Sequence, residues 1–81
     1  MARIGEFERV ESSGKLHPTE VECGYSISTV EGATFVELRT YGSDSRKSDK
    51  KVSQALQLDR AAAARIMEIL EEAFPGLGSA R

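Results

Sequence analysis

The stretch 35–70 constrains the fold of this 81-residue chain more than any other part of the sequence. In residues 35–41 and 51–58, side chains suited to a core recur at every second position. This is the period-two pattern of strands with one covered face. A run without apolar residues, 42–50, separates them. Residues 60–73 then place apolar side chains at spacings of three and four, as one face of a helix requires. This order of elements predicts an α+β domain.

Two further strands are expected before this stretch. In residues 21–28 the side chains of Val21, Cys23, Tyr25 and Ile27 fall on one face, and smaller or polar side chains fall on the other. Gly32 then supplies a residue that tolerates positive φ in a short turn, which predicts an antiparallel hairpin with the following strand. Residues 4–10 are expected to form a weaker first strand. The predicted fold is a four-stranded antiparallel sheet followed by one C-terminal helix.

The ends of the helix are marked by capping residues. Asp59 can accept hydrogen bonds from the free N–H groups of the first turn, and Pro75 with Gly76 stops the helix after Phe74. Two carboxylates, Glu71 and Glu72, lie near the negative end of the helix dipole. The sequence offers no reason for this unfavourable placement.

The length of the chain fits one small domain, 1–81, with flexible ends expected at 1–5 and 76–81. A domain of this size buries a modest part of its surface, and four short strands leave sheet edges open. Pairing with a second copy would remedy both problems. We therefore expect a homodimer.

Composition excludes several kinds of site. The single cysteine, Cys23, cannot form a disulfide within the chain, and with a single histidine, His17, a Cys/His zinc site is excluded. We expect Cys23 to be a small buried apolar residue and His17 a surface residue beside Pro18. The chain has no long apolar run, so we expect no membrane association and a cytoplasmic location. We expect no metal, no cofactor and no enzyme activity.

Positive charge is concentrated between the two central strands, although the chain as a whole carries a net charge of −2. Residues 41–60 contain five Lys or Arg against three Asp, whereas residues 1–40 contain four against seven Glu. Cations neutralise phosphates, and aromatic rings near them can stack on unpaired bases. The candidate nucleic-acid-binding residues are Phe35, Arg39, Tyr41, Arg46, Lys47, Lys50, Lys51 and Ser53.

Three segments together resemble the positive cofactor four family of transcriptional coactivators, which bind single-stranded DNA and are akin to the Whirly fold. They are Val36-Glu37-Leu38-Arg39-Thr40-Tyr41, Arg46-Lys47-Ser48-Asp49-Lys50-Lys51-Val52-Ser53 and Leu56-Gln57-Leu58-Asp59. The resemblance covers about half of the chain. It implies a dimer formed through the helices and a curved sheet that grips unpaired strands without sequence preference. It also implies that Arg39 and Tyr41 lie on the binding strand, with Arg46 and Lys47 on a loop.

The sequence thus predicts a homodimeric, non-sequence-specific protein that binds single-stranded DNA or RNA. A protein-interaction module that docks a partner segment on its sheet would also suit these patterns, as would an accessory subunit of a larger enzyme. The basic run at 42–50 is also compatible with an ordinary solvated loop. Salt dependence separates these functions, because counterion release makes nucleic-acid binding fall steeply with added salt.

Overall fold

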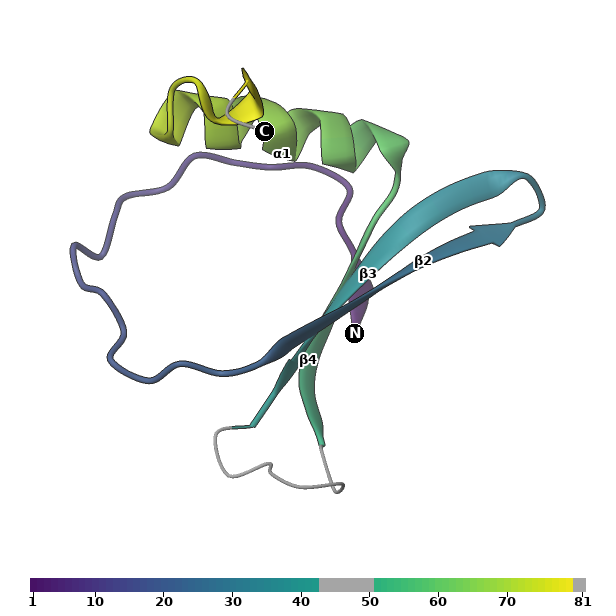
Figure 1. Ribbon diagram of the computed structural model, residues 1–81, viewed down its shortest axis with the longest axis horizontal. Coiled ribbons are helices and arrows are strands. Elements are labelled where there is room, and N and C mark those ends of the chain that lie inside the picture. Colours follow the sequence, from purple (N-terminus) through teal and green to yellow (C-terminus); the bar gives the residue numbers. More distant parts are fainter. Residues whose placement is uncertain (43–50, 80–81) are drawn as a thin grey trace.

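The computed structural model describes residues 1–42 and 51–79, and in this part the chain has the predicted α+β architecture (Figure 1). Four strands form one sheet, and a helix and a short 3-10 turn follow. The elements are β1 (Ala2–Arg3), β2 (Cys23–Val30), β3 (Ala33–Tyr41), β4 (Val52–Leu58), α1 (Arg60–Ala73) and η1 (Leu77–Ser79).

The strands lie in the order β1-β4-β3-β2, and the expectation of an entirely antiparallel sheet is wrong. The pairs β2–β3 and β3–β4 are antiparallel, but β1 runs parallel to β4, with Ala2 opposite Leu56. Turn residues between two predicted strands indicate that the strands pair antiparallel, because a tight turn can join only antiparallel strands. No such turn joins β1 to β4, because the whole β2–β3 hairpin lies between them in the chain.

The hairpin between β2 and β3 confirms the prediction from Gly32. Glu31 has φ 52° and Gly32 has φ 81°, so two consecutive residues adopt the left-handed region, as a two-residue type I′ turn requires. Val30 therefore pairs with Ala33, and the register continues to Cys23 opposite Thr40. This register decides which side chains share a face of the sheet.

The predicted strand at 4–10 is wrong. After β1, Ile4 donates one more backbone hydrogen bond to Gln57, and the chain then leaves the sheet and passes along α1 (Figure 1). Phe7 lies there beside Arg65 and Ile69 of the helix. Phe7 thus lies against α1 and not in the sheet, so the period-two pattern of this segment has no significance. Residues 10–22 then arch away from the sheet, and all of them are exposed.

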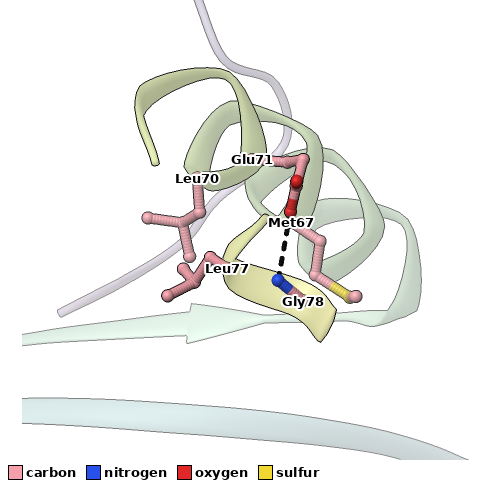
Figure 2. A pocket seen from close by; sticks show the side chains of 5 residues that line it. All are labelled: Met67, Leu70, Glu71, Leu77 and Gly78. Carbon is pink, nitrogen blue, oxygen red and sulfur yellow. Dashed lines mark hydrogen bonds between the residues drawn. The ribbon is translucent and has the colours of Figure 1, made fainter. Parts of the chain in front are cut away.

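The helix begins and ends as the sequence predicts. Asp59 is the N-cap, and its Oδ1 accepts from the N–H of Ala62 at 2.9 Å. At the other end, the Glu71 carboxylate accepts from the N–H group of Gly76 at 2.5 Å. It also accepts from the N–H group of Gly78 at 3.1 Å, as Figure 2 shows. These bonds explain the acidic residue at the negative end of the dipole, because Glu71 holds the turn that follows the helix.

The register divides the strand residues into two faces of different chemistry. The polar face carries Arg3, Gly24, Ser26, Ser28, Val30, Ala33, Phe35, Glu37, Arg39, Tyr41, Ala55 and Gln57. The apolar face carries Ala2, Cys23, Tyr25, Ile27, Thr29, Thr34, Val36, Leu38, Thr40, Gln54, Leu56 and Leu58. Every Lys, Arg, Asp or Glu of the described strands therefore lies on the polar face.

Little of the described chain is buried. The buried apolar residues are Ala55, Leu58 and Ala62, and no side chain is fully enclosed. The expectation of a buried Cys23 is wrong, since it is exposed together with its neighbours on the apolar face, Tyr25 and Ile27. The physical reason is that α1 makes its main contacts with β4 and η1 and leaves β2 without a covering layer. No helix in the described ranges has the length and apolar character needed to cross a membrane.

Candidate nucleic-acid interface

Three of the predicted binding residues lie together on the polar face. Phe35, Arg39 and Tyr41 alternate along β3, with Phe35 and Tyr41 half-buried and Arg39 exposed. Strand β3 is central in the sheet, so its side chains stand between those of β2 and β4. The predicted residues Arg46, Lys47 and Lys50 lie outside the described residues.

Lys51 and Ser53 lie at the end of the sheet where Tyr41 is found. Tyr41 pairs with Val52 and Thr40 pairs with Gln54, so Ser53 is the extra residue of a β-bulge. Both Lys51 and Ser53 are exposed. Gly42 donates its N–H to the Lys51 carbonyl at 3.3 Å, which joins the two strand ends on either side of residues 43–50. The structure thus brings a cation and a hydroxyl group near the aromatic end of β3.

At the centre of the polar face, Glu37 is buried between two donors. Gln57 Nε2 donates to Oε1 at 3.0 Å, and Arg39 Nε donates to Oε2 at 2.5 Å. Only 8% of Glu37 is exposed. The hydrogen bond from Gln57, followed by that from Arg39, holds the pKa of the Glu37 carboxyl below its ordinary value. Glu37 is therefore an anion at neutral pH and offsets part of the positive charge of Arg39.

This ion pair also orients Arg39. The hydrogen bond uses Nε, and 49% of the Arg39 side chain remains exposed. A guanidinium carries five N–H donors in a planar fork, so the bond to Glu37 occupies one of them. The remaining donors are what a phosphate or a base edge could accept from.

Tyr41 lies across Gly24 of the neighbouring strand. A Cβ atom at Gly24 would stand 2.7 Å from the Tyr41 hydroxyl oxygen and 3.5 Å from the ring, so a larger residue there would displace the side chain. Gly24 is opposite Arg39 in the register, so the Tyr41 side chain reaches the position across the strands from Arg39. The pairing of β2 with β3 thereby gathers an aromatic ring and a cation on the same part of the polar face.

Two residues of this face, Arg3 and Glu37, were not predicted as part of the site. Arg3 reaches it because β1 pairs with β4, where Arg3 is opposite Gln57. No local pattern predicts that pairing. Glu37 and Gln57 were placed on the correct face by their alternation with apolar neighbours, but their mutual contact depends on the register between β3 and β4. A search for charged residues at period two within one strand would have found the Glu37 and Arg39 pair.

No protein-family model, curated protein or solved structure matches this chain at a significant level.

Proposed function

We propose that this protein binds single-stranded DNA or RNA without sequence specificity, as a homodimer, through the polar face of its sheet. One observation carries the proposal. The register gathers Arg3, Arg39, Phe35 and Tyr41 on one face, and within the described strands it leaves the other face without Lys, Arg, Asp or Glu. Guanidinium groups neutralise phosphates, and the two rings offer platforms for unpaired bases.

Binding of this kind needs no catalytic group. The phosphate backbone would contact Arg39 and Arg3, and bases would stack beside Tyr41. Lys51 and Ser53 would contact the nucleic-acid strand where it passes the end of the sheet. Base stacking contributes about 1–3 kcal/mol per base in proteins of this type, and each phosphate contact adds to the salt dependence. Because the chain is acidic overall, we expect the affinity to be moderate at physiological salt.

The test is fluorescence anisotropy with a labelled oligonucleotide, single-stranded or duplex, at two salt concentrations. We expect selective binding of the single strand that weakens at higher salt. Arg39→Ala and Tyr41→Ala should each reduce the affinity about tenfold, the loss of a stacking or charge-assisted contact. Arg65→Ala is the matched control, because Arg65 pairs with Glu68 on the exposed surface of α1. Binding that is absent at low salt, or equally reduced by all three variants, would refute the proposal.

An alternative function has one observation in its favour. Strand β2 forms an edge of the sheet and has a hydrogen-bonded neighbour, β3, on one side. A partner segment could add a strand at this edge, as in β-augmentation. Such docking depends on backbone hydrogen bonds and apolar pockets, so its affinity would change little with salt. A salt-insensitive complex with a protein, together with no binding of oligonucleotides, would favour this function.

A further inference from the structure

In the part of the chain that the structure describes, two apolar surfaces lack a complete covering layer. The first, here called the sheet patch, consists of residues that adjoin one another on the apolar face: Tyr25, Ile27, Val36, Leu38 and Leu56. Tyr25 is 75% exposed and Ile27 is 68% exposed. Contiguous apolar surface of this kind marks an interaction site in most proteins.

The second surface, here called the helix patch, is formed by the C-terminal half of α1 and the turn that follows it. It consists of Met67, Leu70, Phe74 and Leu77, which are all exposed. Figure 2 shows Leu70 and Leu77 side by side, with Met67 on the neighbouring turn. The opposite side of the helix contacts Phe7 of the N-terminal segment. The N-terminal segment therefore covers one side of α1 and leaves the helix patch exposed.

The chain exposes more surface than a compact domain of its size would. The chain exposes 7439 Å². A folded monomer of 8.8 kDa is expected to expose about 4,800 Å², so the excess is roughly 2,600 Å². The radius of gyration, 14.9 Å, likewise exceeds the value of about 11.7 Å expected for a compact domain of this length. The exposed arch of residues 10–22 contributes to this excess, and the two patches contribute the rest. If each of two chains covered half of its excess, they would bury about 2,600 Å² in total, the size of an obligate homodimer interface.

We infer that the sheet patch of one copy is covered by the helix patch of a second copy, and reciprocally. A sheet must bury its apolar face against another layer, and α1 contacts β4 but leaves β2 uncovered. In a two-fold dimer each contact occurs twice, so helix on sheet covers both patches in one interface. Sheet on sheet would leave the helix patch exposed, and helix on helix would leave the sheet patch exposed.

The chemistry of the two patches favours a second copy over a nucleic acid. Among the described strand residues, the apolar face carries no Lys, Arg, Asp or Glu, so it has no cation to offer a phosphate. The helix patch is bordered by the carboxylate of Glu71, which would repel a phosphate. Reciprocal packing would also leave the polar face available. This inference specifies the self-association included in the proposed function, and its test does not involve nucleic acid.

The first measurement is the molar mass in solution by light scattering at micromolar concentration. We expect the mass of a dimer. Ile27→Asp should abolish the dimer, because the charge would be buried in the interface. Val30→Asp is the matched control, since Val30 is also exposed and lies on the polar face of the same strand. A monomeric parent protein, or a dimer that tolerates Ile27→Asp, would overturn the inference.

Crosslinking decides the packing without relying on variants that could unfold. In a Cys23→Ser background, Ile27→Cys and Met67→Cys are introduced separately and together, and a short bis-maleimide is added. We expect covalent dimers from the doubly substituted chain and little product from either single one. Efficient crosslinking through Ile27→Cys alone would indicate sheet on sheet, and through Met67→Cys alone helix on helix. Either result would overturn the inference.

A helix-on-sheet dimer that binds no oligonucleotide would refute the proposed nucleic-acid function and leave this inference standing.

Discussion

At the scale of the residue, Glu37 determines how much positive charge the polar face presents. It occupies the centre of that face and accepts hydrogen bonds from Gln57 and Arg39. An anion in this position opposes phosphate binding but holds the guanidinium in place. These two effects can be separated experimentally, because glutamine keeps the shape of the side chain and removes its charge.

We expect Glu37→Gln to raise the affinity for single-stranded DNA severalfold at low salt. The charge of Arg39 would no longer be offset, and a more positive face attracts the phosphate backbone. Anisotropy titrations measure the change, and a thermal melt verifies that the variant is folded. Glu68→Gln is the matched control, because it changes net charge equally but lies on the exposed surface of α1. Equal effects of the two variants would mean that net charge, not the polar face, governs binding.

At the scale of the element, the turn after α1 depends on one carboxylate. Hydrogen bonds from the N–H of Gly76 and then of Gly78 lower the pKa of Glu71. A pKa that is lower in the folded state means that the ionised form stabilises the fold. That contribution is complete above the ordinary glutamate value of 4.5 and is lost as the pH falls through the folded pKa below it.

We therefore expect Glu71→Gln to lower the melting temperature at pH 7 and to weaken its fall between pH 5 and pH 2. Thermal unfolding followed by circular dichroism at several pH values measures both effects. The comparison is with Glu68→Gln, which removes a carboxylate paired with Arg65 on the same helix. If the two variants melt alike at every pH, the bonds to Gly76 and Gly78 contribute nothing to stability.

At the scale of the whole molecule, the described chain consists of a sheet whose apolar face is largely uncovered and a helix that exposes apolar side chains. Its three buried apolar residues, Ala55, Leu58 and Ala62, are a small core for a stable domain. In the dimer that we infer, association would supply most of the remaining hydrophobic stabilisation. Folding and dimerisation should consequently occur together.

We expect the melting temperature to rise with protein concentration, by about 4 °C for each tenfold increase, if unfolding and dissociation are coupled. Scanning calorimetry over a hundredfold range of concentration measures this dependence. Val30→Asp should retain the same slope, since its side chain lies outside both patches. A melting temperature that is independent of concentration would show that the single chain is stable by itself.

Some of this protein is determined by local sequence. Asp59 caps the helix, Pro75 and Gly76 end it, and Gly32 makes the hairpin, since each acts through residues only a few positions away. Alternation within a strand is also local, so the separation of Arg39 and Tyr41 from Leu38 follows from the sequence. These rules were sufficient to predict α1, the hairpin and the face on which Phe35, Arg39 and Tyr41 lie.

The tertiary structure decided everything that depends on which distant segments meet. Parallel pairing of β1 with β4 places Arg3 opposite Gln57, and Gln57 donates a hydrogen bond to Glu37. Phe7 lies against α1 and not in the sheet. The tertiary structure also left Cys23 exposed, because a period-two pattern specifies that a face is apolar but not what covers it. The sequence by itself determined the elements and their faces, and the tertiary structure determined their neighbours, since long-range pairing depends on register and packing across the whole chain.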